Sequence, residues 1–145
     1  MITKMSHATV WVRNQQEALE FYRDKLGFRV AGESENYGVE QEHLNQVFGA
    51  RLRITGLRAA NEPGIEFLEY ITPPGGRALP AGAKANDLVF WNTHLITRGA
   101  QVVVGNLKSQ GIMFVSKGTA GPQIVRDPDG HALEIDADAS VQANR

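Results

Sequence analysis

The sequence contains no cysteine, which excludes disulfide bonds, thiolate metal ligands and a cysteine nucleophile together. A chain without disulfides fits the cytoplasm, which is the location we expect. No apolar run approaches the roughly 20 residues of a membrane span, and the start, MITKMSHATV, lacks the apolar core of a signal peptide. The formal net charge is only −1. We therefore expect neither a membrane nor a nucleic-acid partner.

Two short segments near the opposite ends carry the clearest functional signal. In SHATVWVRN, His7 opens a predicted strand, and in RDPDGHALEID, Glu134 lies on a strand just after a tight turn. A histidine and a glutamate carried by two repeated halves would suit a metal site. The length of 145 residues suits one domain over residues 1–145.

The first half begins with a strand and a helix. Apolar residues alternate over residues 7–13, which predicts a strand. Asn14, with an acidic residue three positions on, gives the capping pattern of a helix over residues 15–26. Gly27 provides the left-handed residue that ends such a helix, and a second strand is expected over 28–31.

The remainder of the first half is less regular before it becomes strongly alternating. Residues 33–49 are polar, and we expect there a short helix near 42–49 that could cover a pocket. A hairpin is predicted from strands over 50–59 and 64–72. Residues 73–82, rich in proline and glycine, predict an extended crossover.

The second half repeats this order of elements. Asp127 to Gly130 forms a tight turn, and His131 is expected to steady it. The predicted elements are a strand over 87–98, a helix over 100–110 and short strands over 112–115, 123–126 and 131–136.

Each half is therefore predicted to be a βαβββ module. The modules cover about residues 5–72 and 86–137, and the crossover covers about 73–85. Together they predict an α+β fold in which two paired modules form a curved, cup-shaped mixed sheet with the helices outside.

These motifs resemble the vicinal oxygen chelate superfamily, which includes glyoxalase I, bleomycin resistance proteins, extradiol dioxygenases and methylmalonyl-CoA epimerase. The likeness is strongest to glyoxalase-like single-domain members and covers nearly the whole chain. The segments that carry it are HATVWVRN followed by ALEFYRDKLGF, then GIEFLEYITPPGGR, and finally RDPDGHALEI.

The resemblance implies a divalent metal bound at four positions on the inner face of the cup. His7 matches the position near the start of the first strand, and Glu134 matches the position on the last strand. On the last strand of the first module, Glu66 and Glu69 compete, and they point to opposite faces because strand side chains alternate. We prefer Glu66, because its apolar neighbours then share the face that packs against the helix.

The first strand of the second module departs from the family pattern. Counting back from Arg98 as from Arg13 places Asn92 where the family has His or Gln. His94 faces the same side, about 6.6 Å further along the strand. Three alternatives stay open: Asn92 is a weak oxygen ligand, His94 substitutes through a bulge, or the site lacks a fourth protein ligand.

The implied chemistry follows from this ligand set. A divalent ion held by imidazole and carboxylate, with open positions, can bind two neighbouring oxygens of a substrate. Such ligands suit Zn, Ni, Fe, Co or Mn. In a glyoxalase-like reaction, Glu134 or Glu66 would also act as the general base. The candidate substrate-binding residues are Trp11, Arg53, Tyr70 and Phe90.

The leading hypothesis is therefore a metal-dependent enzyme of the glyoxalase or dioxygenase type, acting on a small molecule with vicinal oxygens. Lyase or isomerase chemistry is preferred over dioxygenase chemistry, because the second histidine is displaced. The alternative is a metal-free, drug-sequestering binding protein of the bleomycin-resistance type. A homodimer is what the resemblance implies.

Overall fold

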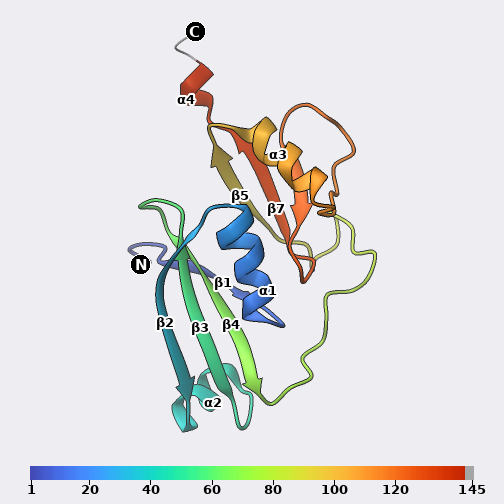
Figure 1. The fold of residues 1–145 in the computed structure, drawn as a ribbon. Coiled ribbons are helices and arrows are strands. Elements are labelled where there is room, and N and C mark those ends of the chain that lie inside the picture. Colours follow the sequence, from blue (N-terminus) through green and yellow to red (C-terminus); the bar gives the residue numbers. More distant parts are fainter. Residues whose placement is uncertain (143–145) are drawn as a thin grey trace. The chain divides into compact units, whose positions relative to one another are not determined.

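Two mixed sheets, one of four strands and one of three, form in the computed structural model, which describes residues 1–142. They belong to two units, Met1–Arg77 and Ala78–Arg145 (Figure 1). Each unit combines a sheet with helices, so the predicted α+β class is confirmed. Among the residues described, no helix is both long and apolar enough to cross a membrane.

The first unit contains a four-stranded sheet in the order β1-β4-β3-β2. Its first strand runs parallel to its last, while β3 is antiparallel to both β4 and β2. In chain order its elements are β1 (His7–Trp11), α1 (Gln15–Leu19), η1 (Glu20–Lys25), β2 (Arg29–Tyr37), α2 (Val39–Asn45), β3 (Arg51–Arg58) and β4 (Gly64–Thr72).

The helix of this unit begins as its sequence predicts. The side chain of Asn14 accepts a hydrogen bond from the backbone N–H of Glu17 at 3.2 Å, which confirms the N-cap. The helix continues from α1 into the π-helical turn η1, and Gly27 follows with a left-handed φ of 84°. A capped start and a glycine stop therefore set its length.

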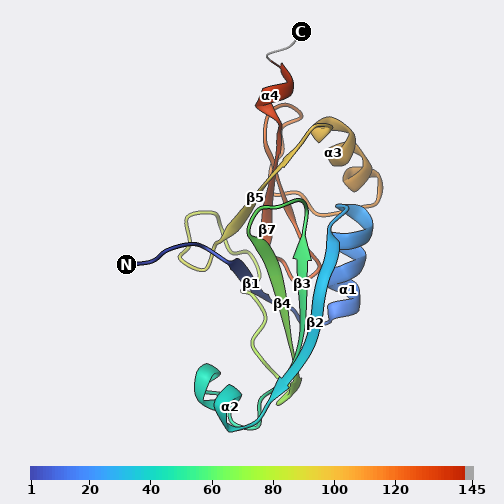
Figure 2. The same cartoon turned by 90° about the vertical axis from the view of Figure 1, so that its left-hand side faces the viewer.

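One face of the sheet is covered by this helix and the other is largely open. Figure 2 shows α1 on one side of β2, β3 and β4. The ring of Tyr22 packs edge-on against Phe67 and Phe28, with centroids 4.9 Å and 6.0 Å away. Ile65 and Phe67 are buried on this side, whereas Glu66 between them faces the open side. The alternation along β4 thus separates a core face from a face available to ligands.

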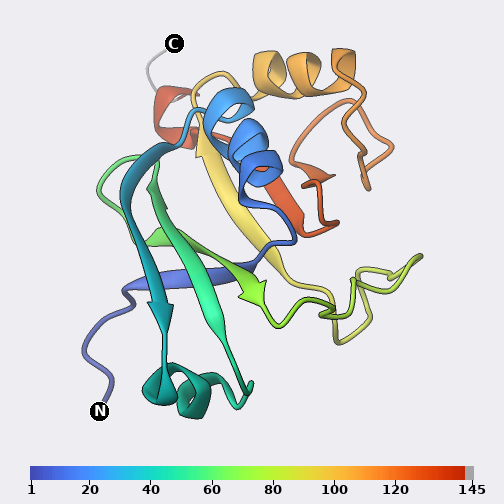
Figure 3. The same ribbon diagram turned by 60° about the horizontal axis from the view of Figure 1, so that its bottom comes forward.

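The segment expected to be irregular is largely regular. β2 extends to Tyr37 instead of ending near residue 31, and α2 begins at Val39, earlier than predicted. Figure 3 shows α2, the teal helix, at the end of β2 and β3. The sequence does not reveal this strand because all of β2 is exposed at the sheet edge, so it has no buried face to produce an apolar alternation.

The second unit has a three-stranded sheet in the order β5-β7-β6. Again the first strand is parallel to the last, and β6 is antiparallel to β7. Leu107 of the helix is buried, as are Leu133 and Ile135 of β7, against which α3 packs. The elements are β5 (Asn92–Thr97), α3 (Ala100–Ser109), β6 (Gln123–Arg126), β7 (Ala132–Ala137) and α4 (Ala139–Gln142).

Two predicted strand segments of this unit are wrong. Residues 87–91 form turns, so β5 begins only at Asn92. Residues 112–115 make a single bridge, between Phe114 and Val125, instead of a strand. The second unit is therefore βαββ among the described residues, a shortened form of the first.

Candidate functional site

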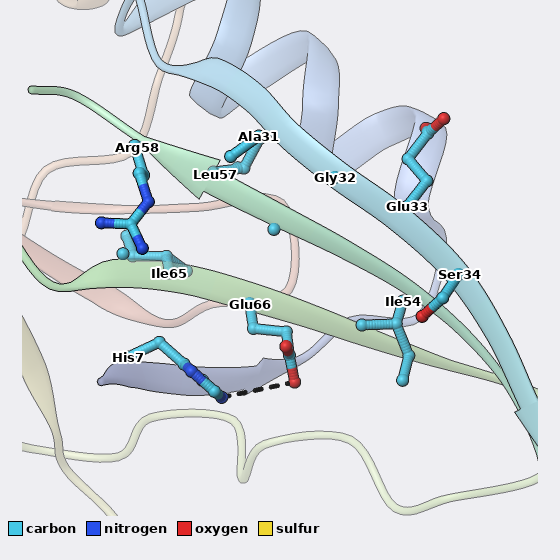
Figure 4. Close-up of a pocket in the computed structure, with 12 residues that line it drawn as sticks. His7, Ala31, Gly32, Glu33, Ser34, Ile54, Leu57, Arg58, Ile65 and Glu66 are labelled. Atoms are coloured by element: carbon cyan, nitrogen blue, oxygen red, sulfur yellow. Dashed lines mark ion pairs between the residues drawn. The ribbon is translucent and has the colours of Figure 1, made fainter. Parts of the chain in front are cut away.

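A pocket of about 350 Å³ lies on the open face of the first sheet. Its lining comes entirely from the first unit and includes His7, Glu66 and Arg58 (Figure 4), together with Gly32 and Gly56. A pocket of this size accommodates a small molecule.

Strand pairing explains why these residues meet. β1 pairs with β4 so that His7 lies opposite Gly64 and Thr9 lies opposite Glu66. β3 pairs with β4 so that Gly56 lies opposite Glu66. Since neighbouring strands lie about 4.8 Å apart, a residue from β1 and a residue from β4 two positions apart in register come into reach of each other.

His7 and Glu66 form the centre of this site. The Nε2 atom of His7 lies 3.5 Å from Oε1 of Glu66, and their side chains are 40% and 29% exposed (Figure 4). The other ring nitrogen of His7, Nδ1, lies 3.0 Å from the hydroxyl oxygen of Ser6. An imidazole nitrogen and a carboxylate oxygen are therefore held side by side at the pocket, with access to solvent.

The competing glutamate lies on the other face of the sheet. Oε2 of Glu69 accepts a hydrogen bond from the backbone N–H of Gln15 at 3.0 Å, at the first turn of α1. Nη1 of Arg53 lies 3.6 Å from the same oxygen. Glu69 and Arg53 thus stabilise the start of the helix, and neither is among the pocket-lining residues. This placement separates both from the pair formed by His7 and Glu66.

The aromatic candidates are placed differently from one another. By register, Trp11 lies opposite Leu68 and Tyr70 lies opposite Leu52, which puts both on the Glu66 side of the sheet but outside the pocket lining. Phe90 belongs to the turns before β5, where the guanidinium of Arg126 lies 5.9 Å from the centre of its ring.

In the second unit, Glu134 has polar neighbours on the same face of the sheet. The side-chain N–H of Asn92 donates to Oε2 of Glu134 at 3.0 Å. Nε2 of His94 is 4.0 Å from Oε1 of Glu134 and 3.4 Å from Oδ2 of Asp136. Sequence reasoning missed Asp136, although its position two residues after Glu134 on a strand is the signal that places it on that face.

The strand registers of the two sheets show which residue of the second unit, Asn92 or His94, corresponds to His7. In the first unit, His7 pairs opposite the residue two before Glu66, and Thr9 pairs opposite Glu66 itself. In the second, Asn92 pairs opposite the residue two before Glu134, and His94 pairs opposite Glu134. Asn92 is therefore the counterpart of His7, and His94 is the counterpart of Thr9.

The donor chemistry suits a divalent metal, but within the described residues neither unit gathers a full set of ligands. Within residues 1–142, no group of three or more His, Asp or Glu side chains is gathered closely enough to hold a metal ion. The first unit offers one nitrogen and one carboxylate, and the second offers a carboxylate with Asn92 or His94. Imidazole with carboxylate is a set that several divalent metals accept.

Both units repeat a module in which a strand and a helix are followed by further strands, and each carries a histidine and a glutamate on one sheet face. Repeated modules of this kind define the class of protein. Residues 4–135 match the Glyoxalase/Bleomycin resistance protein/Dioxygenase superfamily, and the chain belongs to this family. The family name covers both enzymes and a resistance protein. Among curated proteins, none matches this sequence.

Solved structures support the fold. A glyoxalase family protein from Bacillus cereus is 16% identical, with a TM-score of 0.81 over 94% of this chain and 95% of that one. A FosX fosfomycin resistance protein from Listeria monocytogenes, complexed with Mn(II) and 1S,2S-dihydroxypropylphosphonic acid, is 16% identical, with a TM-score of 0.63 over all of both chains. TnmS3, an antibiotic-binding protein from Streptomyces sp. CB03234, is 17% identical, with a TM-score of 0.60 over 95% and 98%.

Proposed function

We propose that this protein is a metal-dependent enzyme of the glyoxalase or dioxygenase type, with lyase or isomerase chemistry on a small molecule that has vicinal oxygens. The observation that carries the proposal is the pair of Nε2 of His7 and Oε1 of Glu66, 3.5 Å apart at the edge of a pocket. The FosX relative, crystallised with Mn(II) and a vicinal diol, supports the choice of metal and substrate class.

His7, Glu66 and Glu134 are the proposed protein ligands, and Asn92 supports Glu134. The side-chain N–H of Asn92 donates to Oε2 of Glu134, so Glu134 would hold an ion through its other oxygen. We also propose that residues 1–145 act as one glyoxalase-like domain and that the protein is a homodimer.

The chain's own residues then have distinct roles. A divalent ion, when bound, would polarise a substrate carbonyl and favour removal of the neighbouring proton. Glu66 lies at the pocket with one oxygen facing His7, so Glu66 is the first candidate to accept that proton, and Glu134 is the second. The contact of Nδ1 of His7 with Ser6 orients the ring so that Nε2 faces Glu66.

Manganese binding tests the proposal directly. We expect isothermal titration calorimetry of the full chain with Mn²⁺ to give a saturable site. Glu66→Gln should weaken Mn²⁺ binding at least about tenfold, because removal of the carboxylate charge removes a ligand. Glu134→Gln should do the same.

Glu69→Gln is the matched control, since it removes the same charge from the same strand on the opposite face. Its Mn²⁺ affinity should equal that of the wild type. Equal affinities for the Glu66→Gln and Glu69→Gln proteins, or no saturable Mn²⁺ binding by the wild type, would reject the metal-dependent enzyme.

A second candidate is a metal-free binding protein that sequesters a small molecule. It is favoured by the small number of metal-binding side chains gathered in any one place within residues 1–142, and by the likeness to an antibiotic-binding protein. The test measures the binding of bleomycin through the tryptophan fluorescence of the protein, before and after the protein is treated with EDTA. Micromolar binding that survives EDTA would favour this candidate, whereas loss of binding would exclude it for this ligand class.

A further inference from the structure

We propose that Arg58 binds an anionic group of the substrate, so that the pocket selects short-chain molecules that carry a carboxylate, phosphate or phosphonate beside their vicinal oxygens. This inference rests on the proposed function, because it assigns a substrate class to the pocket that contains His7 and Glu66. The geometry that points to it is a single cation on the rim of that pocket with most of its hydrogen-bond donors unused.

Arg58 stands at the end of β3, on the same face as Glu66. The final pair between β3 and β4 joins Leu57 to Ile65, so Arg58 lies beside Gly64, which in turn lies opposite His7. A Cβ added to Gly64 would lie 3.4 Å from Cγ of Arg58, which shows that the arginine stem crosses this glycine. Figure 4 shows the side chain extending from β3 toward β4, the strand of Glu66.

The guanidinium has donors to spare. Among residues 1–142, its hydrogen bond runs from Nη1 to the carbonyl of Glu62, 2.9 Å away, and no carboxylate forms an ion pair with it. An arginine carries five N–H donors in a planar fork that matches a carboxylate or phosphate. Several of these donors therefore remain for a ligand.

The second unit contains an internal comparison. Arg126 precedes Glu134 by eight positions, as Arg58 precedes Glu66, and each donates through Nη1 to the carbonyl four residues on. Arg126, however, also donates from Nη2 to the carbonyl of Ala83 at 3.1 Å and lies near an aromatic ring. The contacts that hold Arg126 in place therefore use more of its donors, whereas Arg58 retains capacity for binding.

The neighbouring acids do not neutralise Arg58 by direct contact. Glu62 is the closest in sequence, but its carboxylate accepts hydrogen bonds from the backbone N–H groups of Ala59 and Ala60 at 3.0 Å and 2.9 Å. Those backbone bonds are the main reason that the pKa of Glu62 is lowered, and the charge of Arg58 contributes less. Glu33 also lines the pocket, but its side chain points away from His7 and Glu66 (Figure 4).

Two glycines on the strands next to β4, Gly56 of β3 and Gly32 of β2, leave space for the ligand. Gly32 pairs opposite Gly56, which pairs opposite Glu66. A Cβ on Gly32 would meet nothing within 4 Å, and one on Gly56 would meet only a carbonyl at 3.8 Å. Arg58 and His7 stand two strands apart, about 10 Å between Cα atoms. Arg58 lines the same pocket as His7 and Glu66, so one small ligand in that pocket can contact both the guanidinium and the pair.

Three matched probes test the inference: glycerate, glycerol 3-phosphate and glycerol share neighbouring hydroxyl groups, and only the first two carry an anion. Binding is measured by NMR titration of the full chain, with and without Mn²⁺. We expect the wild type to bind at least one anionic probe about tenfold or more tighter than glycerol, a difference of about 1.4 kcal/mol. The anion with the larger preference identifies carboxylate or phosphate as the recognised group.

The variants separate Arg58 from general electrostatics. Arg58→Met keeps the stem over Gly64 and should abolish the preference, while Arg58→Lys should keep part of it. Arg29→Gln is the matched control, because Arg29 pairs opposite Arg58 and donates to the carbonyl of Ala60 but does not line the pocket. Thermal melting verifies that each variant is folded.

A preference that survives in Arg58→Met, an equal loss in Arg29→Gln, or no preference in the wild type would overturn the inference. The Mn²⁺ titration of the wild type separates this result from the proposed function. Loss of the metal proposal with an intact anion preference in the metal-free protein would leave the role of Arg58 standing.

Discussion

At the scale of single residues, the turn after β6 shows how one buried carboxylate organises a loop. Oδ1 of Asp127 accepts the backbone N–H groups of Asp129 and His131, each at 2.9 Å. Oδ2 lies 2.8 Å from Nδ1 of His131. These contacts confirm the prediction that His131 stabilises the turn. The turn also sets the start of β7, the strand that carries Glu134.

His131 should make stability depend on pH. Burial by itself lowers the pKa of His131, but its hydrogen bond to Asp127 and the charges of Asp127 and Asp129 outweigh burial and raise the pKa above the ordinary 6.5. A raised folded-state pKa gives stability that is fully present below the unfolded value and is lost as the pH rises through the folded value. His131→Gln should therefore cost about 1–2 kcal/mol in acid and less in alkali.

Urea unfolding of the wild type and of His131→Gln at about pH 5.5 and pH 8.5 measures this difference, with the two values chosen to lie on either side of the ordinary histidine pKa. The difference in urea midpoint between the wild type and His131→Gln should be smaller at about pH 8.5 than at about pH 5.5, values that lie about a unit or more on either side of the ordinary histidine pKa. A difference that stays constant would mean that the charged form of His131 adds nothing to stability.

At the scale of elements, the start of β4 depends on close approach of two backbones. Gly64 has no left-handed φ, yet a Cβ there would lie 2.6 Å from the carbonyl oxygen of Leu57. Only glycine allows β3 and β4 to pair at this point without a shift of one strand. Because Arg58, Gly64 and His7 lie in adjacent positions of three strands, this glycine also sets the geometry of the pocket.

Gly64→Ala should destabilise the protein by about 1–3 kcal/mol, the usual cost of forcing extra volume into a packed contact. Gly32→Ala is the control, since its Cβ would meet nothing within 4 Å. Urea midpoints of the two variants measure the difference. Equal midpoints for Gly64→Ala and Gly32→Ala would show that β3 and β4 shift apart at Gly64 without a loss of stability.

At the scale of the whole molecule, a long connection joins the two units. Residues 73–91 contain no helix or strand, and residues 72–80 are exposed throughout. The unit boundary falls at Arg77, inside this connection. Its proline and glycine content explains both features, because these residues favour extended and turn conformations over regular structure.

Limited trypsin digestion should cut first after Arg77, since exposed chain without secondary structure is the preferred site of proteolysis. Mass spectrometry should then show fragments 1–77 and 78–145. Arg77→Gln should slow this first cut while leaving later cuts unchanged. A first cut inside β3, at Arg51 or Arg53, would instead show that the first sheet opens more readily than the connection.

Much of the fold could be predicted because its signals are local. The cap at Asn14, the stop at Gly27 and the alternation along β4 each depend on residues within a few positions of one another. The same alternation is enough to predict that Glu66 and Glu69 lie on opposite faces of the strand. The exposed end of β2 lacks such a signal, and the apolar run over residues 112–115 makes one bridge without forming a full strand, so both predictions were wrong.

The sequence by itself determined which residues alternate, where the helix after β1 begins and ends, and that two halves repeat. Only the tertiary structure decided that His7 meets Glu66, that Asn92 donates a hydrogen bond to Glu134, and that Arg58 lines the same pocket as His7 and Glu66. These neighbours come from strands far apart along the chain. Pairing register brings them together, and register depends on hydrogen bonds between strands that no local pattern specifies.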